Sequence, residues 1–142
     1  MELEQLIEFY ESLTIDSLPL FFVYYSHDAY FKDPFNEVRG VESIQHIFRH
    51  MFAQVQSPRF VITERVSDAN GAVLGWKFTF QTGRSSRLAT HEILGVSHLK
   101  FDALGKVHYH RDYWDAAEEL YMKLPLIGIL MRFLRRRLSA KS

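Results

Sequence analysis

The chain has 142 residues, which is the size of a single domain. Apolar residues make up 47% of it and aromatic residues 15%, enough for a core together with an apolar cavity or interface. Seventeen basic residues balance seventeen acidic ones, so the overall charge gives no reason to expect nucleic acid as a partner. The chain has no cysteine, which excludes disulfides, thiolate metal sites and a cysteine nucleophile.

The first ten residues are acidic and amphipathic, unlike the basic and then apolar start of a signal peptide. The longest apolar run covers only residues 124–131, whereas a membrane-spanning helix needs about 20 apolar residues. We therefore expect a cytoplasmic protein.

Helical patterns dominate the first part of the chain. Apolar residues recur at helical spacing near the N-terminus and again after Gly40, where the stripe is clearest. Asp16 is suited to cap a helix, and Pro19 is tolerated in the first turn that follows. The expected elements are a helix within residues 3–13, a helix from Asp16 to Tyr25, a strand from Ala29 to Lys32 and a helix from Ile44 to Val55.

Long strands are expected in the second part. Asn70-Gly71 lies between two of them and is a strong signal for a β-hairpin. The expected elements are strands over 59–67, 72–82, 87–101 and 106–115, and a helix over 116–138 that is interrupted at Pro125. Helices followed by a meander of strands predict one α+β domain, with a core of about 1–116 and a C-terminal helical extension of about 116–142.

The order of these elements and three groups of motifs carry a resemblance. The motifs are His27-Asp28-Ala29-Tyr30-Phe31-Lys32-Asp33-Pro34, then Ile93-Leu94-Gly95-Val96, then Gly105-Lys106-Val107 leading into Arg111-Asp112-Tyr113-Trp114-Asp115. Over about residues 1–116 the chain resembles the nuclear transport factor 2-like superfamily, which includes ketosteroid isomerase, limonene epoxide hydrolase and the SnoaL-like polyketide cyclases. The resemblance implies a cone-shaped, curved antiparallel sheet wrapped on the N-terminal helices, with the active site inside.

The resemblance also suggests site residues. Asp33 resembles the general base of ketosteroid isomerase, and Tyr10 lies near the position of its oxyanion-hole tyrosine. The carboxylic acid that completes that hole falls on Ser97, a weaker hydrogen-bond donor, so steroid isomerisation is not the expected reaction. Asp112 matches an acid–base aspartate of limonene epoxide hydrolase and of SnoaL-type cyclases.

Two further positions separate the chain from limonene epoxide hydrolase. The arginine and aspartate that complete its catalytic trio fall on Lys77 and Thr79. The second carboxylate is therefore missing, and epoxide hydrolysis is not expected. The resemblance nevertheless implies that Lys77 and Thr79 face the cavity and bind the ligand.

Strand alternation permits two interpretations of residues 74–81, because side chains two apart share a face. One face carries Leu74, Trp76, Phe78 and Phe80, and the other carries Gly75, Lys77, Thr79 and Gln81. Composition alone places the aromatic face in the core. The resemblance places it outside, where such a large apolar surface would form a homodimer interface, and a homodimer is expected on that basis.

The same alternation predicts a cluster of polar groups inside an apolar cleft. His110, Asp112 and Trp114 share a face of one strand, and His91, Ile93 and Ser97 share a face of another. Asp33, His91, His110 and Asp112 would then converge on the ligand, with Ile93 and Trp114 contributing apolar contacts. Burial would raise the pKa values of the carboxylates and lower those of the histidines, which suits acid–base work.

Two other interpretations of these polar groups stay open. In one, they form a structural hydrogen-bond network in a ligand-binding pocket without turnover. In the other, the pattern His108-x-His110-x-Asp112 chelates a metal, since histidines two apart on a strand can converge on one ion. The family usually works without a metal, so none is expected.

The C-terminal region differs from the rest of the chain in its charge. From Lys123 onward it has six basic residues and no acidic ones, among many apolar residues. One interpretation is a helix that covers part of the shell and closes the open end of the cone, with its cations near the negative end of the helix dipole. The other is an interfacial helix on a membrane surface. Both interpretations suggest an apolar ligand.

Together these observations predict cofactor-independent acid–base chemistry of the isomerase, cyclase or hydratase type on a small apolar, carbonyl-containing or lipid-like molecule. Asp33 and Asp112 would transfer the proton, Tyr10 and Ser97 would donate hydrogen bonds to developing negative charge, and His110 and His91 would assist. The alternative is a non-catalytic binding module for an apolar ligand, and an interaction module working through its surface is the third alternative. No metal, cofactor or nucleic acid is expected.

Overall fold

The computed structural model describes residues 2–84, 86–116 and 136. The elements are, in chain order, α1 (Leu3–Glu11), the 3-10 helix η1 (Ile15–Leu20), α2 (Phe21–Tyr24), β1 (Tyr25–Lys32), β2 (Glu37–Arg39), α3 (Val41–Gln54), β3 (Gln56–Asp68), β4 (Gly71–Thr82), β5 (Ala89–Phe101) and β6 (Val107–Tyr113). The C-terminal helical extension expected over about 116–142 lies almost entirely outside the described residues.

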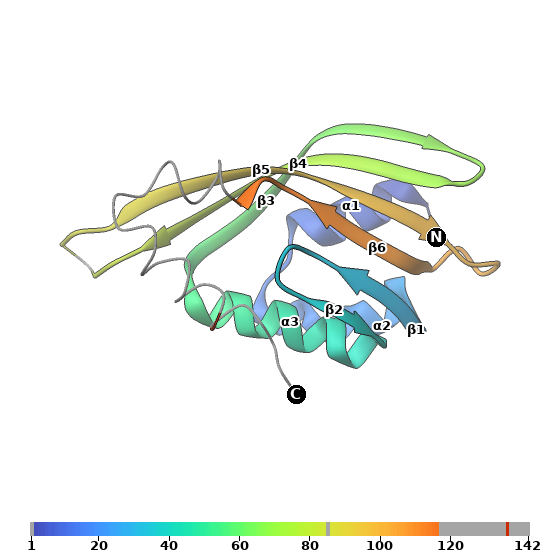
Figure 1. Ribbon diagram of the computed structural model, residues 1–142, viewed down its shortest axis with the longest axis horizontal. Coiled ribbons are helices and arrows are strands. Elements are labelled where there is room, and N and C mark those ends of the chain that lie inside the picture. The colour runs from blue at the N-terminus through green and yellow to red at the C-terminus, as the bar shows by residue number, and fades with distance from the viewer. Residues whose placement is uncertain (1, 85, 117–135, 137–142) are drawn as a thin grey trace.

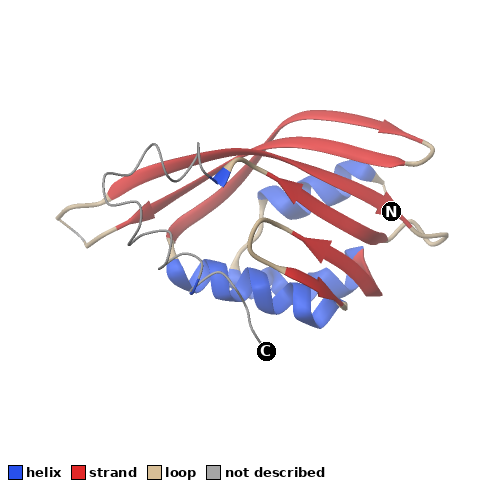
Figure 2. Ribbon diagram, in the orientation of Figure 1, coloured by secondary structure: helices blue, strands red, loops and turns tan. Residues whose placement is uncertain are grey.

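Six strands form one curved, open sheet in the order β2-β1-β6-β5-β4-β3. All neighbouring strands run antiparallel except β1 and β6, which pair in parallel. The helices gather on one face of this sheet, as Figures 1 and 2 show. The structure thus confirms the predicted α+β class and the curved sheet wrapped on N-terminal helices.

The core lies between the helices and the inner face of the sheet. Helix α3 places its apolar stripe, including Ile44, Ile47 and Phe48, against the sheet, as its spacing predicts. Gly40 precedes this helix with a φ of 109°, a conformation that favours glycine. A second cluster of buried side chains on β4 and β5 consists of Trp76, Phe78, Phe80 and Ile93.

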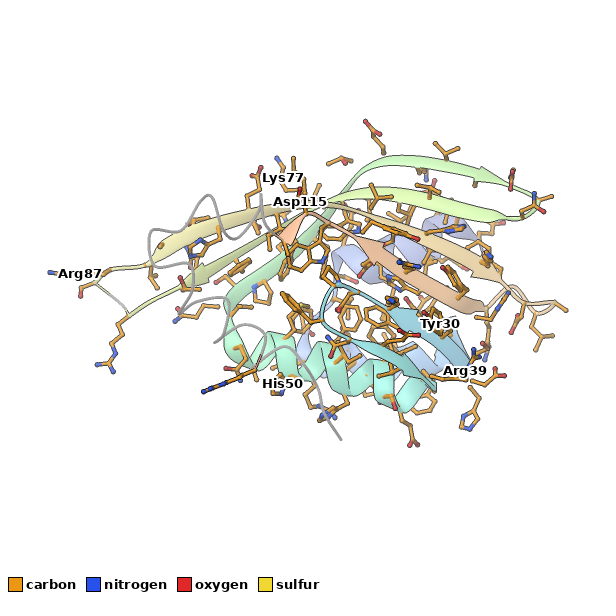
Figure 3. All side chains as sticks on the ribbon, in the orientation of Figure 1. Tyr30, Arg39, His50, Lys77, Arg87 and Asp115 are labelled. Carbon is orange, nitrogen blue, oxygen red and sulfur yellow. The ribbon has the colours of Figure 1, made fainter. Side chains whose placement is uncertain are left out.

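The second cluster settles the orientation of β4. Trp76 is 6% exposed, and the two phenylalanines that follow on the same face are buried as well. Lys77 lies on the opposite side, where its Nζ is 3.7 Å from a carboxylate oxygen of Glu92, and Figure 3 shows it pointing away from the helices. The expectation that the aromatic row forms an outer homodimer interface is therefore wrong about the face, because these side chains fill the inside of the curved sheet.

The chain between α1 and α3 departs from the expected elements. Instead of one helix from Asp16 to Tyr25 there is a 3-10 helix containing Pro19 and then the short α2. Strand β1 begins at Tyr25, four residues before the expected start, because Tyr25 already pairs with Val107 on β6. The edge strand β2 has only three residues and was not expected. Among the described residues, no helix is long and apolar enough to cross a membrane.

Candidate active site

Asp33 lies in the tight connection between β1 and β2. Its Oδ1 accepts hydrogen bonds from the backbone N–H groups of Phe35, at 2.8 Å, and Asn36, at 2.7 Å. The side-chain amide of Asn36 also donates to both carboxylate oxygens, at 3.2 and 3.3 Å. An aspartate that bonds to the backbone ahead of it stabilises a turn of this kind. The turn therefore fixes the position of the Asp33 carboxylate.

Asp112 lies on β6, directly opposite Ser97 in the pairing of β5 with β6. The Ser97 hydroxyl donates to Oδ1 of Asp112. The indole Nε1–H of Trp76, on β4, in turn donates to Oγ of Ser97 at 2.9 Å. Three adjacent strands thus supply one linked set of polar groups, and Asp112 is held from the β5 side.

His110, two residues earlier on β6, contacts the same oxygen of Asp112. The Nε2 atom of His110 lies 2.6 Å from Oδ1 of Asp112. The Nδ1 atom of the same ring lies 2.6 Å from the Tyr25 hydroxyl, and that hydroxyl lies 2.6 Å from the Tyr10 hydroxyl. Tyr10, Tyr25 and His110 are all buried, so this hydrogen-bonded chain is shielded from solvent.

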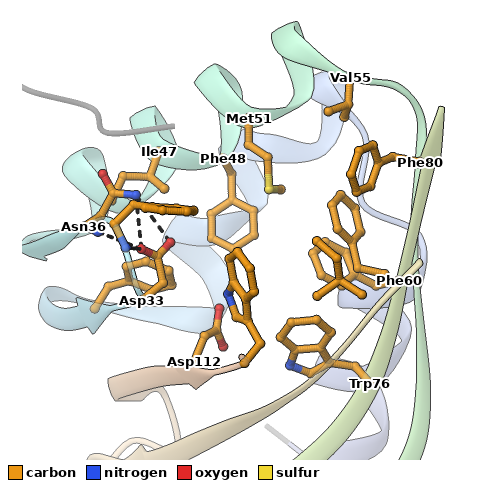
Figure 4. Close-up of a pocket in the computed structure, with 15 residues that line it drawn as sticks. Asp33, Asn36, Ile47, Phe48, Met51, Val55, Phe60, Trp76, Phe80 and Asp112 are labelled. Atoms are coloured by element: carbon orange, nitrogen blue, oxygen red, sulfur yellow. Dashed lines mark hydrogen bonds between the residues drawn. The ribbon is translucent and has the colours of Figure 1, made fainter. Parts of the chain in front are cut away.

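A pocket of about 70 Å³ lies beside the two carboxylates. Its lining is Phe31, Asp33, Phe35, Asn36, Ile47, Phe48, Met51, Val55, Phe60, Trp76, Phe78, Phe80, Ile93, Asp112 and Trp114. Figure 4 shows Asp33 and Asp112 on one side of the pocket, across from Phe60 and Phe80. Two acidic groups therefore share a pocket whose other walls are almost entirely apolar.

Two further hollows adjoin this pocket. One, of about 20 Å³, is lined in part by Tyr10, Ser97 and His110 and shares Asp112 with the main pocket. The other is a shallow hollow of about 600 Å³ among the described residues, and it shares Asp33, Asp112 and Trp114 with the main pocket. Asp112 lies in the lining of all three, at the point where the apolar interior meets the outside.

Burial sets the electrostatics of these groups. Loss of hydration raises the pKa of Asp33 to about 6, and the nearby charge of Asp112 raises it further, while the hydrogen bonds from Phe35 and Asn36 oppose the shift. Burial also raises the pKa values of the Tyr10 and Tyr25 hydroxyls well above their usual range. Both tyrosines therefore stay protonated, and Asp33 gains or loses its proton near pH 6.

Most of the residues predicted for the site lie close together. Asp33, Asp112, Ile93 and Trp114 line the main pocket, and Tyr10, Ser97 and His110 line the small hollow next to it. Their functional roles stay predictions.

Three predicted residues lie elsewhere. Lys77 and Thr79 alternate with the inward-facing aromatic side chains of β4 and so face away from the pocket, contrary to expectation. His91 shares the inner face but lies further along the strand, where its Nε2 is 2.7 Å from Oγ1 of Thr82 and burial lowers its pKa. It does not line the pocket with the carboxylates.

Tyr25 and Asn36 belong to the site although their sequence positions do not predict it. The helical pattern before β1 ends at Tyr25, and nothing in the spacing of the sequence places this residue beside one on β6. Asn36 had a signal, because Asp-Pro-Phe-Asn is a sequence typical of a turn in which the aspartate is bonded locally. The pocket walls supplied by α3 and β3, such as Phe48 and Phe60, could be predicted as core but not as pocket.

The alternative of a metal site at His108, His110 and Asp112 fails on geometry. The pairing of β5 with β6 is irregular next to His108, which is exposed, whereas His110 is buried. An irregularity in a strand moves a side chain to the other face. Within the part of the chain that the structure describes, no group of three or more histidine or acidic side chains is arranged to hold a metal ion.

The comparison with protein families agrees with this architecture. Residues 6–110 match the SnoaL-like domain. The chain belongs to this family. The match confirms the resemblance that the motifs carry, and it includes Asp33 and His110 but ends just before Asp112.

Solved structures show the same fold as this SnoaL-like protein. A candidate polyketide cyclase of Acidithiobacillus ferrooxidans superposes with a TM-score of 0.69 at 17% identity, over 89% of this chain and 99% of that one. A candidate SnoaL-like polyketide cyclase of Shewanella putrefaciens gives 0.66 at 21% identity, over 86% and 98%. A protein of Catenulispora acidiphila with a ketosteroid isomerase-like fold, in complex with trimethylamine, gives 0.66 at 12% identity, over 84% and 89%. A comparison with curated proteins finds no significant match.

Proposed function

We propose that this SnoaL-like protein transfers protons, without a cofactor, on a small apolar molecule that contains a carbonyl group. The observation that carries the proposal is that Asp33 and Asp112 line one pocket whose other walls are almost entirely apolar. Carboxylates in such surroundings act as acids and bases near neutral pH more readily than carboxylates in water. The reaction would be of the isomerase, cyclase or hydratase type, and an isomerisation or cyclisation would begin with removal of a proton beside the carbonyl.

The two carboxyl groups suit complementary roles. Asp112, as a carboxylate, would take a proton from the carbon next to the carbonyl, and the electron pair of that C–H bond would move toward the carbonyl oxygen. Asp33, whose pKa is raised to about 6, would give its proton to that oxygen and so produce an enol. In a substrate with a carbon–carbon double bond adjacent to that carbon, the product is a dienol. Return of the proton from Asp112 to the far end of the dienol, with shift of the double bond, and of the enol proton to Asp33 would complete an isomerisation and leave the enzyme unchanged.

The donors expected for the developing charge are already used within the protein. The single hydroxyl proton of Ser97 goes to Asp112, and the Tyr10 hydroxyl is bonded to Tyr25. Asp33 is therefore the better candidate for a donor to the substrate oxygen, because it lines the main pocket itself.

The second candidate function is binding of an apolar ligand without turnover. It is supported by the aromatic walls of the pocket, among them Phe48, Phe60 and Trp76. Ligand pockets are mostly apolar with a few polar groups that orient the ligand, and the two carboxyl groups would have that part here.

Hydrogen–deuterium exchange tests the proposal without knowledge of the natural substrate. The protein is incubated in deuterated buffer with small enolisable ketones such as cyclohexanone, and deuterium uptake beside the carbonyl is followed by NMR. We expect exchange above the buffer rate, reduced about 100-fold or more in Asp112→Asn and in Asp33→Asn. Thr79→Val, on the opposite face of the sheet, is the matched control and should exchange like the wild type.

Two outcomes would overturn the proposal: exchange no faster than in buffer, or exchange that both aspartate variants leave unchanged. Quenching of tryptophan fluorescence by the ketone without exchange would favour the binding module, because Trp76 and Trp114 both line the pocket. The homodimer and the cytoplasmic location expected from the sequence stay predictions.

A further inference from the structure

Tyr25 belongs to a chain of polar groups that the proposed proton transfers of Asp33 and Asp112 with the substrate leave unexplained. Hydrogen bonds link Tyr10 to Tyr25, Tyr25 to His110, His110 to Asp112, Asp112 to Ser97 and Ser97 to Trp76. The chain joins α1 to β4 through the interior. Each member has a limited number of protons to donate, so the direction of each bond can be assigned by accounting for donors and acceptors.

One end of the chain has a fixed direction. The indole N–H of Trp76 is a donor only, so Ser97 accepts there and gives its single proton to Oδ1 of Asp112. An aspartate that begins the reaction as a base is a carboxylate and accepts only. The bond between His110 and Asp112 is then donated by Nε2–H of His110.

The direction of the remaining bonds follows. A neutral histidine carries one proton, so Nδ1 of His110 accepts, and the Tyr25 hydroxyl is its donor. The Tyr25 oxygen then accepts from the Tyr10 hydroxyl. In the reverse direction the buried Tyr10 hydroxyl would have no acceptor among the described residues, and an unpaired buried donor is costly. The forward direction gives every donor a partner.

We propose that Tyr25 is a positioning residue that donates to Nδ1 of His110, holds His110 as the Nε2–H tautomer and so leaves Oδ2 of Asp112 to accept the substrate proton. The inference rests on the proposed function for the role of Asp112. All hydrogen bonds to Asp112 within the described residues use Oδ1, which is consistent with an open Oδ2. A proton that arrives on Oδ2 leaves Oδ1 an acceptor, so the chain need not reverse during turnover.

The competing arrangement is a proton wire. In it the proton received by Asp112 passes to His110, and Nδ1–H then donates to Tyr25 and onward to Tyr10. The two arrangements differ in one measurable property, which is the ring nitrogen of His110 that carries the proton.

NMR of the full chain labelled with ¹⁵N-histidine measures that property. Two-bond ¹H–¹⁵N correlations distinguish the tautomers, and His110→Gln identifies the His110 signals among the seven histidines. We expect a protonated Nε2 and an unprotonated Nδ1 at the pH of the exchange experiment. A coupling across the hydrogen bond from the Tyr25 hydroxyl proton to Nδ1 should be visible in the wild type.

Two variants test the part of Tyr25. Tyr25→Phe removes the donor to Nδ1, and we expect the coupling to Nδ1 to disappear and the Nδ1 signal to shift away from its hydrogen-bonded position. Tyr10→Phe is the matched control, because it removes one buried tyrosine hydroxyl but leaves the donor to His110, so the coupling and the tautomer should persist. Nδ1–H or imidazolium signals in the wild type would overturn the inference, as would a Tyr25→Phe spectrum identical to that of the wild type.

These results are independent of the exchange experiment. If NMR shows the expected tautomer but the protein catalyses no deuterium exchange, the proposed function is wrong. The positioning by Tyr25 then has no catalytic purpose, but the hydrogen-bond assignment stands. If the exchange depends on Asp112 but His110 is found as the other tautomer, the proposed function is supported and the inference about Tyr25 is wrong. If Tyr25→Phe fails to fold, the wild-type tautomer and the coupling to Nδ1 still decide the outcome.

Discussion

The hydroxyl of Tyr25 lies 2.6 Å from Nδ1 of His110, although the two residues are 85 positions apart in the chain. The first begins β1 and the second lies on β6, and these strands are neighbours in the sheet. Both side chains are almost completely buried, at 1% and 3% exposure. The hydrogen bond therefore ties the N-terminal part of the fold to the strand that carries Asp112.

We expect Tyr25→Phe to lower the free energy of unfolding by about 1–3 kcal/mol, because it leaves a buried ring nitrogen of His110 without its donor. Urea unfolding followed by circular dichroism measures the change. Tyr30→Phe is the control: its hydroxyl donates to the exposed carboxylate of Glu37, at 3.3 Å, and its loss should leave stability nearly unchanged. Equal stability of the two variants would contradict the prediction.

Asp33 should make stability depend on pH. Its pKa is raised in the folded protein from 3.8 to about 6, so the folded state binds the proton more tightly than the unfolded state. The resulting stabilisation is complete below about pH 4 and is lost as pH rises through 6. A pKa difference of this size corresponds to about 3 kcal/mol. The stability of the wild type relative to Asp33→Asn should therefore fall by up to that amount between pH 4 and 7.

Unfolding of both proteins in urea at a series of pH values measures this difference. Asp28→Asn, at an exposed position on β1, is the matched control for replacing an aspartate by asparagine. A wild type that gains stability over Asp33→Asn as pH rises would show that the carboxylate is stabilised in its charged form, contrary to the prediction.

The sequence was sufficient for the features that depend on local periodicity. The apolar stripe of α3, the long strands and the α+β class follow from repeats of 3.6 and 2 residues. Alternation also grouped Trp76 with Phe78 and Phe80 correctly. Alternation could not show which side of the sheet is inside, since both faces of a strand have the same period. The composition of the two faces predicted the buried face correctly, whereas the resemblance did not.

The site was predictable where a motif carries it and not where it depends on packing between distant strands. Asp33 and Asp112 follow from family motifs, and both line the pocket. Tyr25 reaches His110 only because β1 pairs in parallel with β6, a neighbour relationship that the local sequence does not encode. Lys77 was misplaced because its assignment came from alignment with a relative and not from the burial of its neighbours.

Because the aromatic row of β4 is buried inside the protein, we expect a homodimer to form through the outer face of the sheet instead. Leu94, Val96 and Tyr113 are exposed there, at 50%, 38% and 48%. Adjacent exposed apolar side chains of this kind often mark an interface. We expect light scattering at micromolar concentration to give a dimer mass, and Leu94→Lys to shift it to the monomer. Leu104→Lys, in the turn before β6, is the control, and a monomeric wild type would contradict the prediction.

Gly95 should be essential for the position of Trp76. The two residues are directly opposite in the pairing of β4 with β5, and a Cβ at Gly95 would overlap the indole ring of Trp76. Gly95→Ala must therefore displace a ring that lines the pocket and donates to Ser97. Overpacking of this kind lowers the free energy of unfolding by about 1–3 kcal/mol.

Urea unfolding and intrinsic fluorescence of Gly95→Ala measure this effect. Gly75→Ala is the matched control, because the nearest atoms to a Cβ there are in the side chains of Thr63 and Glu64, at 3.3 and 3.4 Å, and the backbone N of Glu64, at 3.8 Å. In a double-mutant cycle with Trp76→Leu, Gly95→Ala should cost less than it does alone, since the smaller side chain removes the clash. If Gly95→Ala costs the same with Trp76 and with leucine at that position, the ring does not depend on the glycine, and the pocket wall would have to be positioned by other contacts.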